Sequence, residues 1–378
     1  MATTGGLDAP RLARMEAIHV RVPFRRPLLD ATGEFTHRRS WLLRIVDEHG
    51  NQGLGEAVLN PFAEEVTTDA LARLMRALPA ELAAGRVPLW SEMAAEGEPG
   101  RAAMAAIEGA LGALEAARSE PAERRARPPI PVGAIIAFAG PDAGADAAAQ
   151  AVELGFETLK LRAGFERTTD QLVDRVRAIR GAIGPGPRLR VDVSGAWDLE
   201  TATERIYALK PFRIEFVEQP LAAADIGGHA ALRGRAEVPI ALDESIDSEY
   251  SAMAALDARA ADVLVIKPAR VGGSAVTRRI AAASAAAGVG VVLATYYETG
   301  VGIAAALRLA DALRPGPTRT MAPAHALATS GLLVHDLLDA PLPIENGRMA
   351  VPGVLRLEES EVDRCAQERV EAQGRKAT

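Results

Sequence analysis

The stretch TLKLR, at residues 158–162, is the first of five short apolar runs that each end in charge. The others are RLRVDVSG (188–195), IEFVEQP (214–220), IALDES (240–245) and VLVIKP (263–268). Their charged residues recur at intervals of 32, 26, 25 and 24 residues: Lys160, Asp192, Glu218, Asp243 and Lys267. One strand, one helix and two loops take about 25–30 residues, so each interval fits one β/α unit. Because the strands of a parallel β/α barrel all end on one face, we expect three carboxylates and two amines to converge on one pocket.

The composition is that of an ordinary globular protein. Its 378 residues favour one large and one smaller domain, and 48% hydrophobic with 25% charged residues is typical of soluble proteins. The net charge of −7 gives no support for nucleic-acid binding. The N-terminus lacks an apolar signal core and no run is long enough to span a bilayer, which predicts a cytoplasmic protein with no membrane partner. The single cysteine, Cys365, excludes a disulfide within the chain.

The first part of the chain predicts a compact α+β unit. Residues 15–22, 41–46 and 53–58 have strand patterns, and residues 68–84 and 100–118 have helical patterns. The Pro-rich segment PAERRARPPIPVG then marks a boundary. We therefore predict an α+β capping domain over 13–125, a β/α barrel carrying the active site over 126–340, and a C-terminal segment, 341–378, that returns to the capping domain, with a possible returning strand before Leu357.

The second part alternates apolar runs with Ala-rich helical segments. Seven runs suit strands buried on both faces, and an eighth, weaker run lies near 322–328; the seven are 132–138, 158–161, 189–193, 214–218, 240–243, 263–267 and 289–294. About eight units favour a (β/α)7β TIM-like barrel over an open, doubly wound sheet. The absence of a glycine-rich dinucleotide fingerprint after any strand weakens that alternative further.

Three carboxylates at adjacent strand ends repel one another unless a cation lies among them. Oxygen ligands suit a hard cation, so the pattern favours Mg²⁺ first and Mn²⁺ second, and disfavours zinc. Lys267, at the end of a buried run, is a candidate general base whose pKa burial and a nearby metal would lower, and Lys160 is its counterpart across the pocket. Such a site suits removal of a proton α to a carboxylate, with the metal stabilising the enediolate.

The motifs LKLR, VDVSGAW, FVEQPL, ALDES and IKPARVGG, in this order, resemble those of the enolase superfamily. The resemblance covers nearly the whole chain, and it is to the branch of muconate cycloisomerase, dipeptide epimerases and o-succinylbenzoate synthase. It implies that Asp192, Glu218 and Asp243 bind Mg²⁺ and that Lys267 is the strand-six lysine. It also implies supporting roles beside the metal for Gln219 and Glu244.

Absent motifs narrow the branch. The strand-seven end, ATYYETGVG, has no His, so it differs from a mandelate-racemase-like site, and HALATSG lacks the paired aspartates of dipeptide epimerases. The stretch YYETGVG resembles o-succinylbenzoate synthases and muconate cycloisomerases. Glu298 within it is a candidate site residue, with a loop carboxylate that bonds backbone or lysine as the alternative.

Two residues depart from the family pattern. Arg162 stands where this branch normally has the principal lysine base, and arginine stays protonated, so it can stabilise an anion or clamp a carboxylate but is a poor base. Ser194 replaces an expected Asn and keeps only part of its hydrogen bonding. The base is then Lys267, or Lys160 if the backbone shifts. Because Arg162 replaces one of the two bases that a racemase needs, this substitution counts against racemisation.

The favoured function is o-succinylbenzoate-synthase-like dehydration of a small carboxylate. The alternatives are a muconate-type cycloisomerase, a racemase or epimerase, and, in another class, a catalytically silent barrel that binds metal or carboxylate. Specificity is expected from two parts of the capping domain that would close over the barrel mouth, a loop over 24–38 and the segment 60–64, with Arg25 and Arg26 as candidates for a distal carboxylate. His325 and His335 are predicted to be structural or surface residues rather than ligands, and the apolar capping domain favours a homo-oligomer.

Overall fold

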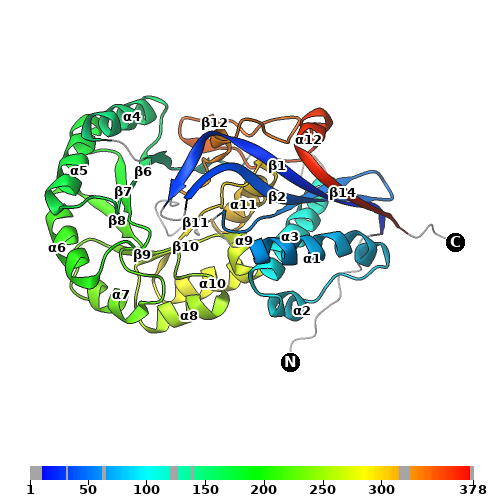
Figure 1. The fold of residues 1–378 in the computed structure, drawn as a ribbon, viewed down its shortest axis with the longest axis horizontal. Coiled ribbons are helices and arrows are strands. Elements are labelled where there is room, and N and C mark those ends of the chain that lie inside the picture. The colour runs from blue at the N-terminus through cyan, green and yellow to red at the C-terminus, as the bar shows by residue number, and fades with distance from the viewer. Residues whose placement is uncertain are drawn as a thin grey trace.

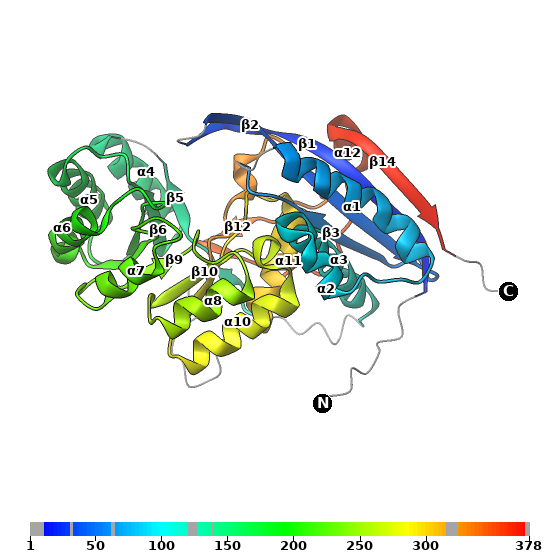
Figure 2. The same cartoon turned by 60° about the horizontal axis from the view of Figure 1, so that its bottom comes forward.

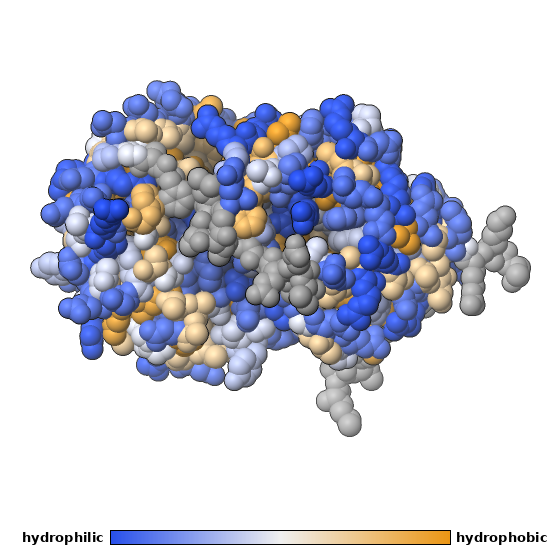
Figure 3. Space-filling view, viewed as in Figure 1, coloured by the Kyte–Doolittle hydropathy of each residue, from blue (hydrophilic) through white to orange (hydrophobic). Residues whose placement is uncertain are grey.

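The computed structural model describes residues 11–30, 33–61, 65–119, 127–137, 140–314 and 324–374. It contains a curled parallel sheet surrounded by helices and, beside it, an antiparallel sheet with helices on one face (Figure 1). The chain therefore has the predicted fold, a TIM-like β/α barrel with an α+β capping domain. No helix in the described ranges is both long and apolar enough to cross a membrane, and the face seen in Figure 3 is largely hydrophilic.

The capping sheet has the strand order β14-β1-β2-β3. Its elements are β1 (Leu12–Asp30), β2 (Gly33–Asp47), β3 (Gln52–Ala57), α1 (Glu65–Ala83), α2 (Trp90–Ala95), α3 (Gly97–Arg118) and β14 (Ala366–Gln373). Inward residues of the strands, such as Met15 and Leu43, pack on Met75 of α1 and Ile107 of α3. At Gly55 a Cβ atom would lie 1.9 Å from the carbonyl oxygen of Ala106, so only glycine allows α3 to lie this close to β3.

The segment 24–38, expected to be a loop, is mostly strand. β1 and β2 form an antiparallel ribbon whose register shifts between Pro23 and Leu28, and the ribbon extends from the cap toward the barrel (Figure 2). The alternation of buried and exposed residues ends at Phe24, so pairing with β2, rather than a sequence pattern, makes the rest of the segment a strand. Residues 31–32 of this segment and 62–64 of the second predicted cap loop lie outside the described residues.

The barrel strands pair in parallel and in chain order. They are β5 (Ala134–Ile136), β6 (Thr158–Arg162), β7 (Arg188–Asp192), β8 (Ile214–Glu218), β9 (Ile240–Leu242), β10 (Val263–Ile266) and β11 (Gly290–Leu293). The outer helices are α4 (Pro141–Glu153), α5 (Thr169–Ile183), α6 (Leu199–Leu209), α7 (Ile226–Arg233), α8 (Glu249–Asp257), α9 (Pro268–Val271), α10 (Ser274–Ala286) and α11 (Gly300–Ala312).

The predicted eighth strand is reduced to two bridges. His325 pairs in parallel with Val132, and Ala326 pairs in parallel with Ala294 at the end of the seventh strand. These bridges join the two sides of the seven-stranded sheet at the place where a full eighth strand would close it. Residues 322–323 of the predicted run lie outside the described ranges.

The C-terminal segment returns to the cap, where Leu355 and Leu357 pack in one cluster with Ile18, but the strand that pairs with the capping sheet lies after Leu357 rather than before it. The turn at Asn346 and Gly347 joins β12 (Ile344–Glu345) to β13 (Arg348–Met349), which pairs with β4 (Ile130–Pro131) at the start of the barrel rather than with the cap. The strand that joins the capping sheet is β14, which follows α12 (Glu359–Cys365) and pairs antiparallel with β1. Its sequence, AQERVEAQ, has little apolar alternation, so the sequence pattern did not reveal it.

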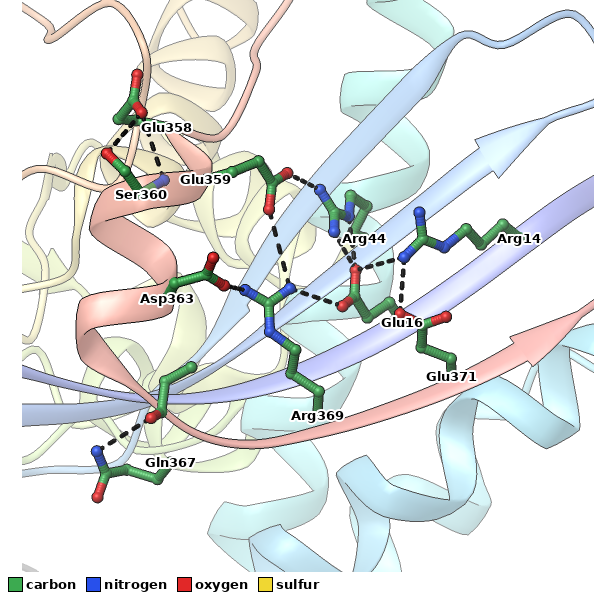
Figure 4. A network of polar contacts seen from close by, with 11 residues as sticks. Arg14, Glu16, Arg44, Glu358, Glu359, Ser360, Asp363, Gln367, Arg369 and Glu371 are labelled. Atoms are coloured by element: carbon green, nitrogen blue, oxygen red, sulfur yellow. Dashed lines mark hydrogen bonds and ion pairs between the residues drawn. The ribbon is translucent and has the colours of Figure 1, made fainter.

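Charged side chains hold β14 on the sheet (Figure 4). The fully buried carboxylate of Glu16 in β1 lies 3.0 Å from Arg369 of β14 and also accepts hydrogen bonds from Arg44 of β2. Arg369 and Arg44 in turn contact acidic residues of α12. Ion pairs thus attach β14 to the sheet, whereas alternating apolar side chains attach the other strands.

Candidate active site

The strand ends place the predicted carboxylates side by side. Arg162 pairs in register with Asp192, and Asp192 pairs with Glu218, so their side chains leave neighbouring strands at one level. Asp243 follows β9, the next strand in the sheet. Asp192, Glu218 and Asp243 are at most 6% exposed. The structure therefore brings together the residues that the spacing predicted would converge.

The two lysines lie on either side of this row of carboxylates. Lys160 Nζ is 2.9 Å from Asp192 Oδ2 and 2.9 Å from Glu218 Oε1, and Lys267 Nζ contacts Asp243 Oδ1. Burial alone would lower the pKa of Lys160, but the Asp192 and Glu218 carboxylates outweigh it and raise that pKa. Asp243 raises the pKa of Lys267 against the effect of burial in the same way. The lowered pKa predicted for Lys267 is therefore not found while Asp243 faces the amine.

The buried acids also perturb one another. Burial, opposed by Lys160 and reinforced by Asp192 and Asp243, raises the pKa of Glu218 to about 7. Burial and the charge of Asp243 raise the pKa of Glu244 to about 8. Glu244 Oε2 is buried and has no hydrogen-bond partner among the described residues. The carboxyl groups at these strand ends therefore lie close enough to raise one another's pKa, and their hydrogen bonds do not fully compensate for this repulsion.

The donor chemistry fits a hard cation, because every candidate ligand atom is a carboxylate oxygen. As the side chains are placed, no three His, Cys, Asp or Glu residues of the described part form a ready-made metal site. The amines of Lys160 and Lys267 instead contact the carboxylates directly. The assignment of Asp192, Glu218 and Asp243 as metal ligands stays a prediction.

Gln219 and Ser194 hold the strand ends and carboxylates in place through hydrogen bonds, and both residues have strained backbone conformations. Their φ angles are 44° and 51°, in the left-handed region that side chains rarely adopt. Gln219 is fully buried, and its Oε1 accepts from the backbone N–H groups of Asp243 (3.0 Å) and Ser245 (3.2 Å), which ties the ends of β8 and β9 together. The Ser194 hydroxyl donates to Asp192 Oδ1 at 3.1 Å.

Arg162 lies at the end of β6 with its side chain 23% exposed. Its Nη1 donates to Asp192 Oδ2 at 3.2 Å. Burial is outweighed by the charge of Asp192, so the pKa of Arg162 is raised and the group remains a cation. A guanidinium that stays charged can attract an anion but cannot accept a proton as a general base.

The predicted substrate-binding residues lie apart from the carboxylate row. Arg25 is exposed, and its Nε donates to the Gly331 carbonyl at 3.1 Å, which links β1 to the segment after the last barrel bridge. Arg26 is exposed on the same ribbon. Glu298 is 4% exposed and lines a cavity of about 220 Å³ between the cap and the barrel. Burial and the charge of Glu56 raise the pKa of Glu298 to about 7.

Two aromatic residues and one arginine near the site were not predicted from the sequence. Tyr296 and Tyr297 follow β11 immediately before Glu298, and the Tyr296 ring centroid lies 5.2 Å from Lys267 Nζ. Tyr297, at φ 61°, packs edge-on against Phe24 of the cap. Arg38, inside the segment expected to be a loop, is 2% exposed. The adjacent tyrosines after an apolar run were the available signal.

His325 has a structural role, as predicted. Its Nδ1 accepts a hydrogen bond from the backbone N–H of Leu293 at 3.0 Å, and burial lowers its pKa to about 3. A neutral ring at this position stabilises the bridge region that joins the last strand to the first.

This fold and this row of charged strand ends define a class of enzyme. Residues 143–354 match the enolase C-terminal domain-like family, so the chain belongs to the enolase superfamily, and its relatives place it in the muconate-lactonizing branch. The enzymes of this branch are lyases and isomerases, and the chain is an enzyme of this kind.

Individual relatives show which members of the branch the chain resembles. The chain is 39% identical to the o-succinylbenzoate synthase of Thermobifida fusca (strain YX) over 246 residues, 64% of this chain and 73% of that protein. It is 32% identical to an N-succinylamino acid racemase of Amycolatopsis over 356 residues, 90% of this chain and 93% of the racemase. Its structure matches muconate lactonizing enzyme from Pseudomonas fluorescens, complexed with muconolactone, with a TM-score of 0.80, 26% identity, and coverage of 95% and 100%.

Proposed function

We propose that this enzyme uses Mg²⁺ to remove a proton α to the carboxylate of a small substrate, in a dehydration like that of o-succinylbenzoate synthase. The observation that carries the proposal is the row of three buried carboxylates with an amine on each side. The likeness to the Thermobifida synthase supports the dehydration in particular.

Asp192, Glu218 and Asp243 would hold Mg²⁺, which when bound acts as a Lewis acid toward the substrate carboxylate. Lys267, at the end of β10, would take the α-proton once Asp243 no longer holds its ammonium form. Lys160 lies across the row and can donate hydrogen bonds to the developing anion. Arg162, partly exposed beside Asp192, can clamp a substrate carboxylate.

Racemisation is the second candidate, because the Amycolatopsis racemase resembles this chain over 90% of its length. A racemase needs a base on each face of the substrate carbon. Here the second face would depend on Lys160, whose amine contacts two carboxylates, or on Arg162, which stays protonated. These contacts favour one-base dehydration over two-base racemisation.

Exchange of substrate α-protons with solvent deuterium tests the proposal. The purified protein with Mg²⁺ is incubated in D₂O with the substrate of o-succinylbenzoate synthase, N-succinylamino acids and muconolactone, and proton NMR follows exchange and product. We expect dehydration of the first compound, and a fall of about 10²–10⁴-fold in Lys267→Ala with fold intact. Exchange of N-succinylamino acids with inversion would favour the racemase. No exchange anywhere, with metal bound, would favour a silent binding barrel.

A further inference from the structure

Tyr296 is the residue through which the cap contacts the candidate base. Its ring packs in a small apolar cluster with Val58 and Ala105 of the cap and Ala269 of the barrel, and it is 5% exposed. The same ring lies 5.2 Å from Lys267 Nζ, within the range of a cation–π contact. The position of the cap therefore bears directly on the surroundings of Lys267.

Arg38 holds the backbone of Tyr296 from the cap side. Its Nη1 donates to the backbone carbonyl of Tyr296 at 3.2 Å, and its Nη2 donates to the carbonyl of Leu59 at 2.7 Å. Leu59 directly precedes the second cap loop. One buried guanidinium thus joins the β2 strand, the entrance of the second cap loop and the end of the seventh barrel strand.

The cost of burying Arg38 indicates a specific role. A buried guanidinium is expensive unless charge and hydrogen bonds compensate it. Glu298 and Glu56 offset part of this cost when they are ionised, and Glu56 also accepts hydrogen bonds from the backbone of Thr299 and Gly302 at the start of α11. Arg38 Nε nevertheless has no partner among the described residues. A methionine would fill the same space without that cost, so packing alone does not account for an arginine here.

We infer that Arg38 is a positioning residue that holds Tyr296 against Lys267 and so couples the seating of the cap to the catalytic amine. The inference rests on the proposed role of Lys267 as the base. When the cap is seated, Arg38 and Val58 fix the Tyr296 ring over the amine, which limits the directions in which Lys267 can reach the substrate. Misplacement of a catalytic group by about 1 Å can cost on the order of 10²-fold in rate.

Steady-state kinetics of matched variants test the inference. Arg38→Met is expected to lower kcat by about 10–100-fold with KM changed less than about threefold. Arg38→Lys should recover part of the loss, because an ammonium keeps the charge but lacks the fork that spans two carbonyls. Arg39→Met, at the exposed neighbouring position, should stay within about twofold of the unchanged enzyme. Tyr296→Phe should retain most activity, and Tyr296→Leu should resemble Arg38→Met without adding to it in the double variant.

Chemical labelling separates this inference from the proposed function. Brief treatment with acetic anhydride, followed by mass spectrometry, reports the acetylation of Lys267 relative to the partly exposed Lys210 in the same molecule. Arg38→Met should raise this ratio several-fold, and Arg39→Met should leave it unchanged. If Lys267→Ala remains fully active, the proposed base is wrong, whereas the labelling ratio still decides whether Arg38 governs Lys267. An unchanged ratio, or an altered ratio with unchanged kcat in an active enzyme, would overturn the inference.

Discussion

At the scale of single residues, Arg162 decides which chemistry this barrel can support. The structure places its Nη1 atom 3.2 Å from Asp192 Oδ2, at the position where the sequence resemblance predicts a lysine. Its raised pKa keeps it charged, so its available roles are to bind an anion or to orient a carboxylate. The residue was identified as a departure from the sequence alone, but its contact with Asp192 required the register of β6 and β7.

Exchanging this arginine for lysine tests its role. If Arg162 clamps a substrate carboxylate with two donors, Arg162→Lys should lower kcat/KM by about tenfold, mainly through a higher KM. Steady-state kinetics on the substrate found by deuterium exchange would measure this, with Arg177→Lys on the exposed face of α5 as the control. A rise in kcat would instead mean that the arginine suppresses chemistry that a lysine can perform.

Glu298 predicts a pH dependence of folding stability. Burial and Glu56 raise its pKa to about 7, above its value in the unfolded chain, so the folded state favours the protonated acid. The free energy of unfolding that the protonated Glu298 contributes is fully present below about pH 4.5, and it is lost as pH rises through about 7. Glu298→Gln should therefore unfold at higher urea than the unchanged protein at pH 8, by at most about 3 kcal/mol, and at similar urea at pH 4.5. The exposed Glu153→Gln should show no such divergence; equal curves at pH 8 would contradict the buried proton.

At the scale of elements, the predictable strands are those that the hydrophobic effect specifies. β6, β7 and β8 are buried apolar runs that end in charge, and the sequence predicted both their extent and their charged ends. The eighth strand was visible only as a weak run, because two bridges suffice to join the sheet there. β14 was missed because ion pairs to residues distant in sequence, rather than its own pattern, place it on the sheet.

The ionic cluster beneath β14 should be a major part of its attachment. Glu16→Gln leaves Arg44 and Arg369 without their buried anion, and removing one partner of a buried pair costs about 3–5 kcal/mol. Urea unfolding should report a loss of this order, and limited proteolysis should cut near α12 sooner. Glu371→Gln removes only the exposed partner of Arg14 and should cost less than about 1 kcal/mol. Equal effects of the two variants would show that the cluster does not hold the strand.

At the scale of the whole molecule, the barrel residues of the site could be predicted from the sequence, whereas the contacts between the site and the cap could not. The barrel residues repeat at unit spacing, so parallel topology alone predicts that they converge. Arg38, Tyr296 and Glu298 meet only because the cap packs on the end of the seventh barrel strand, and no local pattern encodes that contact. The convergence of Asp192, Glu218 and Asp243 therefore followed from the sequence, whereas the surroundings of Lys267 did not.

Mg²⁺ should stabilise the entire fold, because three buried carboxylates on adjacent strands repel one another and a bound cation would offset that repulsion. A ligand that binds only the folded state adds about 2.7 kcal/mol at one hundred times its dissociation constant, so the melting temperature should rise with Mg²⁺ and fall with EDTA. Asp243→Asn should abolish most of this rise, whereas Glu298→Gln, which removes a buried acid outside the carboxylate row, should retain it. Differential scanning calorimetry across a Mg²⁺ series measures both variants. If Asp243→Asn responds to Mg²⁺ as the unchanged protein does, Asp243 is not a ligand and the cation binds elsewhere.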